Sequence, residues 1–261
     1  MASEPRNDYT VITGASSGIG RALSWSLARR GHALILIARD RARLESLSEE
    51  LQQRYNVTAK IKAVDLADTD DLRALCDSLH RLSIRLLVNN AGIATATDFE
   101  HSPTSVQDEI LATNFRAPRE LCQSVLPGML QEKRGGIINV ASLSGVMPGD
   151  PDIGYAASKA ALVSLTRSIS IRFGSKIAVT LALPGFIHTE IHERAGIPAV
   201  NLPRHLWGTA ETAAEEIVTA HEKGRSTVVT PRIYGPLLAL YQLLPRRVGD
   251  AAVHHFHGRT M

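Results

Sequence analysis

Short apolar segments alternate with longer segments of helical periodicity along most of this chain. The apolar segments carry nonpolar residues on both faces, which is typical of strands covered by helices on both sides. We expect strands at Tyr9–Thr13, Ala33–Ala38, Ala59–Val64, Ile84–Val88, Gly136–Ala141, Ile177–Leu183 and Thr227–Thr230. This alternation predicts an α/β fold: a single doubly wound Rossmann-type domain whose mostly parallel, seven-stranded sheet has helices on both faces.

Helical periodicity fills the segments between these strands, and the clearest examples are Gly20–Arg30, Arg41–Arg54, Asp70–Arg81, Ser105–Gln131 and Tyr155–Phe173. No linker or repeat interrupts residues 1–261, so we predict one domain with a dinucleotide-binding and catalytic core at 9–230. Residues 185–208 are too long for an ordinary connection and predict a substrate loop. Residues 232–261 form a C-terminal extension that includes the almost entirely apolar segment Ile233–Leu244.

The composition excludes several classes of protein. The 29 basic and 26 acidic residues are interspersed without a basic run, which argues against nucleic-acid binding. Cys76 and Cys122 match no metal-ligand spacing. The first eight residues are polar, and no stretch approaches the ~20 apolar residues that span a bilayer. We therefore expect a cytoplasmic protein.

A glycine-rich turn, Thr13-Gly14-Ala15-Ser16-Ser17-Gly18-Ile19-Gly20, follows the first expected strand and opens the first expected helix. Glycines let the backbone turn sharply and approach a pyrophosphate, which then lies at the positive end of the helix. The turn predicts a dinucleotide site formed by Gly14, Ser16, Ser17, Gly18, Ile19 and Gly20. A tight strand-to-helix connection without a ligand is the alternative.

The end of the second expected strand bears on which nicotinamide cofactor binds. NAD sites normally place an acid there for the ribose 2′-hydroxyl, whereas this strand ends in Ala38 and is followed by Arg39. Because a guanidinium can bind a 2′-phosphate through two hydrogen bonds, we predict a preference for NADP(H). Asp40 keeps NAD(H) open, since a shift of one residue would supply the acid. A surface Arg–Asp pair is the other interpretation.

Tyr155 and Lys159 lie four residues apart in an expected helix and so project from the same face. A neighbouring ammonium lowers the pKa of a phenol from its usual value of about 10, toward the pH at which acid–base catalysis is effective. Ser142 follows an expected strand at its carboxyl end, where open α/β sheets bind ligands. Its hydroxyl can hydrogen-bond a substrate oxygen as charge develops there.

Together these features resemble the short-chain dehydrogenase/reductase family over residues 9 to about 230. The matching motifs are Thr13–Gly20, Asn89-Asn90-Ala91-Gly92, Asn114, Ser142, Tyr155-x-x-x-Lys159 and Pro184-Gly185, in the family's order. The resemblance implies hydride transfer, without a metal, between a nicotinamide and a carbonyl or secondary alcohol. It makes Tyr155 the general acid in reduction and the general base in oxidation.

The resemblance also implies roles for the other residues. Lys159 would lower the pKa of Tyr155 and hold the nicotinamide ribose, and Ser142 would position the substrate oxygen. The backbone of Asn114 would anchor a water that links Lys159 to solvent. Beyond the glycine-rich turn, the implied cofactor contacts are Arg39, Asp65, Leu66, Asn90, Ala91, Gly92, Tyr155, Lys159, Pro184, Gly185, Ile187 and Thr189.

Some of these polar residues have a second interpretation from the sequence. Asn114 could bend a helix, and Asn89 and Asn90 could form a turn at a strand end. Asp65 and Thr189 could cap helices, as single polar residues often do. A protein that senses NADP(H) without turnover, or a structural or membrane-associated partner, would need fewer of them. The complete set favours an enzyme.

Substrate selectivity would come from residues 94–99, 144–153 and 185–208. Apolar side chains in the last segment suggest an apolar guest, such as a lipid-like, steroid-like or bulky aromatic carbonyl: Ile187, Ile191, Ile197, Val200, Leu202, Leu206 and Trp207. His188 and His192 also lie in this segment, and three more histidines cluster at the end of the chain, at positions 254, 255 and 257. No third ligand accompanies the first pair, so we predict no metal site.

The family resemblance implies a homodimer or homotetramer that pairs through Ser105–Gln131 and Tyr155–Phe173. Apolar residues in these helices exceed one sheet-facing stripe, namely Ile110, Leu111, Val125, Leu126, Leu162, Val163 and Leu165. The apolar segment Ile233–Leu244 is followed by Arg246 and Arg247. We expect it to pack against a partner subunit, and weak association with a membrane surface is the alternative.

Overall fold

The computed structural model describes residues 8–147, 149, 152–190, 203, 206–245, 247–251 and 253. These residues form a seven-stranded parallel sheet of order β3-β2-β1-β4-β5-β6-β9. Its strands are β1 (Tyr9–Thr13), β2 (Ala33–Ala38), β3 (Ala59–Ala63), β4 (Ile84–Asn89), β5 (Gly136–Val140), β6 (Ala178–Pro184) and β9 (Thr227–Thr230). The strand order reverses between β1 and β4, the point at which doubly wound sheets bind their ligands. The predicted fold class is confirmed.

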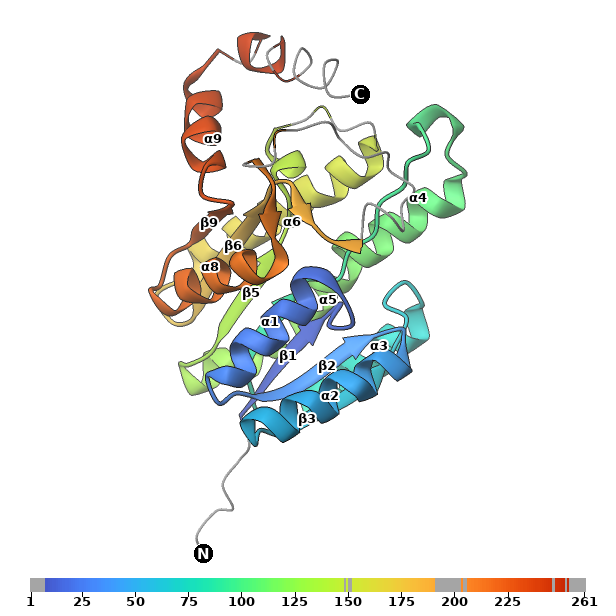
Figure 1. Cartoon of the computed structure of the whole chain (residues 1–261), viewed down its shortest axis with the longest axis vertical. Helices are drawn as coiled ribbons and strands as arrows, with labels where there is room; N and C mark the ends of the chain where they lie inside the picture. Colours follow the sequence, from blue (N-terminus) through green and yellow to red (C-terminus); the bar gives the residue numbers. More distant parts are fainter. Residues whose placement is uncertain are drawn as a thin grey trace, which may run out of the picture.

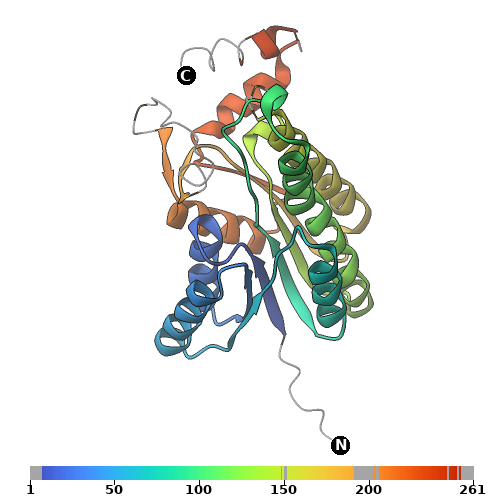
Figure 2. The ribbon, with the colours of Figure 1, turned by 90° about the vertical axis from the view of Figure 1, so that its right-hand side faces the viewer.

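Helices cover both faces of the sheet (Figures 1 and 2). One face packs against α1 (Gly18–Arg29), α2 (Arg41–Tyr55) and α8 (Ala210–Glu222). The other packs against α3 (Thr69–His80), α5 (Ala117–Glu132) and the end of α6 (Ile153–Phe173). Because both faces are covered, all five residues of β1 and of β5 are buried. This explains why their sequences are apolar without alternation.

The expected helix Ser105–Gln131 is interrupted in the structure. It consists of α4 (Thr104–Leu111), a π-turn at Ala112–Arg116 and α5. A π-turn holds one residue more per hydrogen-bonded ring than an α-helix and often marks a functional site. Here it contains Asn114.

The ends of the expected substrate loop pair with each other. β7 (Ile187–His188) and β8 (Gly208–Thr209) form a two-stranded parallel sheet. Short 3₁₀ turns at Phe99–His101 and Leu143–Gly145 complete the connections near the carboxyl ends of the strands. Several predictions fall on residues outside the described part of the chain: Ile191, His192, Ile197, Val200, Leu202, Arg246 and the three C-terminal histidines.

The C-terminal extension contains α9 (Tyr234–Leu243). Tyr234 and Leu238 are buried against the body of the protein, whereas Leu237, Leu240 and Leu243 are exposed. Among the described residues, no helix combines the length and the apolarity needed to cross a bilayer.

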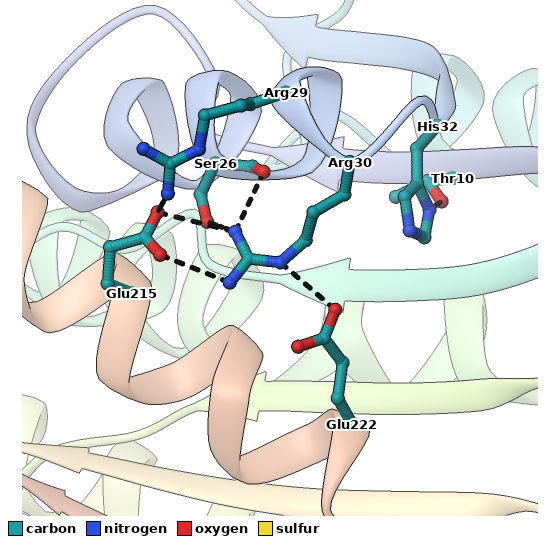
Figure 3. A network of polar contacts seen from close by, with 7 residues as sticks. All are labelled: Thr10, Ser26, Arg29, Arg30, His32, Glu215 and Glu222. Carbon is teal, nitrogen blue, oxygen red and sulfur yellow. Dashed lines mark hydrogen bonds and ion pairs between the residues drawn. The ribbon is translucent and has the colours of Figure 1, made fainter.

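Ion pairs join α1 to α8 near the amino ends of the strands (Figure 3). Arg30 lies 3.1 Å from a carboxylate oxygen of Glu215 and 3.0 Å from one of Glu222. Arg29 lies 2.8 Å from the other oxygen of Glu215. Since α1 begins at the glycine-rich turn and α8 follows the substrate loop, these contacts hold together two helices whose opposite ends border the candidate site.

Candidate active site

The glycine-rich turn is folded tightly against the end of β4. Gly14 and Gly18 have φ angles of +67° and +50°, which favour glycine. A Cβ atom on Gly20 would collide with the carbonyl oxygen of Gly14. Thr13 Oγ1 accepts hydrogen bonds from the backbone N–H groups of Asn90 and Ala91, both at 3.0 Å. The turn is therefore held in one shape by its neighbours.

The N-terminus of α1 has the features of a phosphate site. The N-cap residue Ser17 makes no side-chain hydrogen bond to the helix, and the first turn contains no acidic residue. The free N–H groups and the positive helix end can therefore accept an anion. Thr189 lies directly beside this turn, because a Cβ atom on Gly18 would come within 3.2 Å of the Thr189 side chain. These residues fit the diphosphate of a dinucleotide.

Side chains at the end of β2 distinguish the two readings of Arg39 and Asp40. The Asp40 carboxylate caps α2 by accepting from the Arg43 N–H at 3.0 Å. Arg39 is 60% exposed and lies 3.3 Å from Glu109. The acid is therefore used by its own helix, while the guanidinium extends from the strand end. Arg39 pairs with Glu109 and Asp40 with Arg43, so these neighbours do not form the Arg–Asp pair that the sequence left open.

At the end of β3, Asp65 forms a turn by accepting from the Ala67 N–H at 2.9 Å. The residue that caps α3 is Asp68, which accepts from the N–H groups of Asp70 and Asp71. Leu66 is buried in the core on that side. The helix-cap interpretation of Asp65 is thus wrong, because the cap of α3 is Asp68, three residues later. Its expected contact with adenine stays a prediction.

Lys159 lies in a buried position beside Tyr155. Its Nζ donates to the carbonyl oxygen of Val140 at 3.0 Å and lies 5.7 Å from the centre of the Tyr155 ring. Burial lowers the pKa of Lys159 to about 8, so the amine is mostly protonated at neutral pH. A Cβ atom on Gly92 would lie 3.1 Å from this Nζ, so glycine leaves room for the ammonium. The positive charge favours the phenolate form of Tyr155.

Ser142 is fixed where β5 ends. Its Oγ accepts from the Ser144 N–H at 3.1 Å, and the residue is 9% exposed. That bond uses a lone pair of the hydroxyl and not its hydrogen. Ser142 is therefore oriented by backbone and can donate to an oxygen of a bound substrate.

Asn114 is fully buried and connects three parts of the site. Its Oδ1 accepts from the Ile93 N–H at 2.9 Å, and its Nδ2 donates to the Ile93 carbonyl at 2.9 Å and to Ser158 Oγ at 3.0 Å. The side chain therefore joins the π-turn to the loop after β4 and to α6. This is more than the helix bend that the sequence left open. The water expected at its backbone stays a prediction.

Asp152 is a buried residue that the sequence analysis did not identify. Its Oδ1 accepts from the Tyr155 N–H and its Oδ2 from the Thr95 N–H, both at 2.9 Å, and it is 2% exposed. The carboxylate caps the helix that carries Tyr155 and joins it to the loop after β4. An acid just before an apolar helix is a usual capping signal. The helical pattern in the sequence begins at Tyr155, two residues beyond Ile153, so it does not show the capping role of Asp152.

The chain after β6, which the sequence predicts to line the nicotinamide, is held by backbone and aromatic contacts. The Gly185 N–H donates to the Thr230 carbonyl at 2.8 Å, and the ring of Tyr234 packs on Gly185 closely enough that a Cβ there would lie 2.7 Å away. Pro184 ends the strand. The side chain of Ile187 is 3% exposed and joins the core, so only its backbone is available to line a ligand.

Aromatic side chains gather beside this segment. Phe186 lies with its ring centre 5.5 Å from Trp207 and 6.4 Å from Tyr234. His188 stacks on Trp207 with ring centres 4.5 Å apart, which accounts for this histidine without a metal. The Tyr234 hydroxyl donates to the Leu206 carbonyl at 2.8 Å, and burial raises its pKa to about 12. The C-terminal extension therefore contacts the site through Tyr234, and no sequence motif predicted this contact.

One group of potential metal ligands lies in the described part of the chain. There, Asp98, Glu100 and His101 place ligand atoms within 4.8 Å of one another, but all three are exposed. Exposed acidic groups commonly gather in this way without an ion. The chemistry that the site geometry offers is acid–base chemistry next to a dinucleotide-shaped cradle.

Comparison with known proteins agrees with this geometry. A family model described as short chain dehydrogenase matches residues 8–197. A very-long-chain 3-oxoacyl-CoA reductase from Laccaria bicolor is 36% identical over 165 residues, covering 62% of this chain and 49% of the relative. A very-long-chain 3-oxoacyl-CoA reductase-B from Danio rerio is 30% identical over 208 residues, covering 78% and 67%. The chain spans about half the length of the first of these curated relatives.

Solved structures share the whole fold. A short-chain dehydrogenase from Sphingobium yanoikuyae in complex with NADPH has a TM-score of 0.82 and 29% identity, covering 91% of this chain and 96% of that one. A bulky-bulky ketone specific alcohol dehydrogenase from Comamonas testosteroni has a TM-score of 0.77 and 27% identity, covering 91% and 95%.

Proposed function

Because the chain belongs to the short-chain dehydrogenase family, we propose that it is an NADP(H)-dependent oxidoreductase that reduces an apolar ketone to a secondary alcohol. One observation carries the proposal: Tyr155, the buried ammonium of Lys159 and the backbone-held hydroxyl of Ser142 come from neighbouring elements. A protein that only sensed the dinucleotide would need the glycine-rich turn but not a buried cation beside a phenol.

The residues divide the chemistry between them. The dinucleotide, when bound, supplies the hydride that reaches the carbonyl carbon. Ser142 donates a hydrogen bond to the carbonyl oxygen and holds it. Tyr155 gives its phenolic proton to that oxygen, so the product is a neutral alcohol, and the reverse reaction returns the proton to Tyr155. The charge of Lys159 stabilises the phenolate that the transfer leaves behind.

NADP(H) is the preferred cofactor in this proposal. Arg39 extends from the end of β2, and the Asp40 carboxylate is occupied at its own helix. The Sphingobium yanoikuyae relative was solved with NADPH, which supports the same choice. NAD(H) is the alternative, since Arg39 is also placed to pair with Glu109.

The first substrate class that we propose is a 3-oxoacyl thioester with a long apolar chain. The relatives named above as very-long-chain 3-oxoacyl-CoA reductases support it. So do the aromatic side chains beside Gly185. Steroid-like and bulky aromatic ketones are the alternative substrate classes. The relative described as specific for bulky ketones favours the aromatic class.

The cofactor proposal is tested with Arg39→Ala. We expect its KM for NADPH to rise about 10- to 150-fold, because a hydrogen bond to a charged group contributes roughly 1.5–3 kcal/mol, while its KM for NADH stays nearly the same. Arg41→Ala is a matched control, since Arg41 is 66% exposed, lies two residues away and pairs with Glu45 along its own helix. Equal losses with both cofactors would make Arg39 structural and return NAD(H) to first place.

The activity is tested by NADPH consumption with 3-oxoacyl thioesters of increasing chain length, steroid ketones and aromatic ketones. We expect one alcohol formed for each NADPH consumed, with the highest kcat/KM for a long apolar chain. Binding of NADPH without turnover of any ketone would instead favour the sensor.

Assembly belongs to the proposal as well. Ile110, Val125, Leu162 and Val163 are buried within the single chain, while Leu111 is 44% exposed. Much of the apolar surplus in these helices is thus used inside one chain, and the family resemblance is the main support for a homodimer or homotetramer. Light scattering at micromolar concentration tests it, and a monodisperse monomer would contradict it.

A further inference from the structure

The outer face of the C-terminal extension is apolar. We define the α9 face as the large exposed side chains Ile233, Leu237, Leu240 and Leu243, which are spaced for one side of the helix and are 49%, 46%, 56% and 83% exposed. The inner face of α9 is apolar too, with Tyr234 and Leu238 buried. A surface helix of a soluble protein normally presents polar residues to water. A cluster of this kind indicates an interaction surface.

Basic residues accompany this face. Between positions 231 and 261 the sequence has four arginines, at 232, 246, 247 and 259, against one acidic residue, Asp250. In the described part, Arg232 and Arg247 are both exposed, and Arg232 Nε lies 3.0 Å from a carboxylate oxygen of Glu216. Asp250 accepts a hydrogen bond from the Tyr241 hydroxyl at 3.1 Å. An apolar helix face bordered by cations is the pattern that lies in the interface of an anionic bilayer.

The α9 face lies at the same end of the molecule as the candidate active site. Figures 1 and 2 show α9 at the end of the molecule where the strands finish. Tyr234, the first residue of α9, packs on Gly185 and donates to the Leu206 carbonyl. The helix is therefore attached to both ends of the segment expected to bind substrate. A surface that contacts α9 would therefore lie beside this segment.

We propose that the α9 face docks on the surface of an anionic membrane, with its leucines among the lipid headgroups and acyl chains. Resting on the proposed function, this places the site where a lipid-like ketone is available. A second copy of the chain is a weaker fit. A two-fold pair brings together two extensions that each carry an excess of positive charge even with Arg232 paired to Glu216, whereas anionic headgroups complement that excess.

The test uses the full chain and co-sedimentation with lipid vesicles. We expect binding to phosphatidylcholine vesicles that contain phosphatidylglycerol, and weaker binding to phosphatidylcholine alone or at high salt. The double variant Leu237→Gln/Leu240→Gln should lower partitioning about tenfold or more, because two side chains no longer enter the apolar layer. Ile171→Gln is the matched control, since Ile171 is 88% exposed at the far end of α6, and it should bind as the wild type does.

Two further measurements separate the outcomes. Turnover of a short, water-soluble ketone should be the same in the double variant as in the wild type. If the wild type does not turn over any ketone, this counts against the proposed function and not against docking. Equal, low partitioning of the wild type and the double variant would overturn the membrane proposal. So would a change of oligomeric mass in the double variant without vesicle binding by the wild type, which would assign the face to a second copy.

Discussion

Two basic side chains are buried at opposite edges of the same sheet, and burial lowers the pKa of both. Lys159, at the carboxyl edge, has a pKa of about 8, and His221, at the amino edge, has one of about 4. For His221 the nearby charges of His32 and Arg85 add to the effect of burial. At neutral pH the lysine keeps its proton and the histidine loses it. Burial thus leaves Lys159 charged beside Tyr155, whereas it leaves the imidazole of His221 neutral.

The partners of the two histidines also differ from those of Lys159 and Ser142. At the amino edge, side chains bond to one another: Thr10 to His32 at 2.8 Å and Thr180 to His221 at 3.0 Å. At the carboxyl edge, backbone groups hold Lys159 and Ser142, at Val140 and Ser144, and leave further donors of these side chains for a ligand. We therefore expect substitutions at the amino edge to cost stability and those at the carboxyl edge to cost rate.

The largest effect is expected from Tyr155→Phe. It removes only the phenolic hydroxyl, so kcat should fall at least about a hundredfold, the lower range for loss of a general acid. The free energy of unfolding and the NADPH affinity should stay close to those of the wild type. Steady-state rates, fluorescence titration with NADPH and urea unfolding measure the three quantities. A variant that keeps more than about a tenth of the wild-type rate would contradict the assignment of the acid.

The pH profile of Lys159 comes next. We expect kcat/KM to fall above pH about 8, by roughly tenfold per pH unit, as the buried amine loses its proton. Lys159→Arg should move this limb upward, because a guanidinium stays charged. The pKa of Lys159 is lower in the folded than in the unfolded state, so the native state binds fewer protons. The free energy of unfolding should therefore rise between pH about 8 and about 10. If kcat/KM fell at the same alkaline pH in both proteins, Lys159 would not be the group whose charge supports Tyr155.

Most of the fold followed from local pattern. The strands predicted from apolar segments agree with the structure within about two residues at each end, because both faces of this sheet are covered and leave a strong signal. The π-turn at Ala112–Arg116 did not follow, since Ile110 and Leu121 continue the helical period across it. The pairing of Ile187–His188 with Gly208–Thr209 depends on contacts between residues some twenty positions apart.

The site was predictable where a motif carries the chemistry. Tyr155, Lys159, Ser142 and Asn114 were predicted because their order and spacing are specific. In the structure Lys159 lies beside Tyr155, and Asn114 bonds to Ser158 of the same helix. Asp152 and Tyr234 carry no motif. Their roles follow from which backbone groups lie near them after folding, at Thr95 and Gly185, and a single sequence does not show such distances.

The amino edge should be sensitive to acid. The pKa of His221 is about 4 in the folded protein and about 6.5 when unfolded, so stability is complete above about pH 6.5 and is lost as the pH falls toward 4. We expect the wild type to lose about 2 kcal/mol of unfolding free energy between pH 8 and pH 5 from this group alone. His221→Gln should flatten that dependence in urea unfolding, with kcat unchanged at neutral pH. The exposed His80, changed to Gln, is the control and should leave the slope as it is.

The smallest effect is expected from removing a helix cap. Comparing the cap of α6 with the cap of α3 also tests most directly whether the two ends of the strands differ in role. Asp152→Ala and Asp68→Ala each remove a carboxylate that accepts from two backbone N–H groups, and each should cost about 1 kcal/mol of stability. Only the first cap fixes Tyr155, so only Asp152→Ala should also lower kcat, by about tenfold, through displacement of the phenol. The KM for NADPH should not change in either variant. Asp152→Asn should be intermediate, because an amide has one oxygen to offer two N–H groups. Urea unfolding together with kcat measured from pH 6 to pH 9 separates these outcomes. If both Ala variants lost the same stability and kept the wild-type kcat, the role of Asp152 would be purely structural, although it lies beside Tyr155.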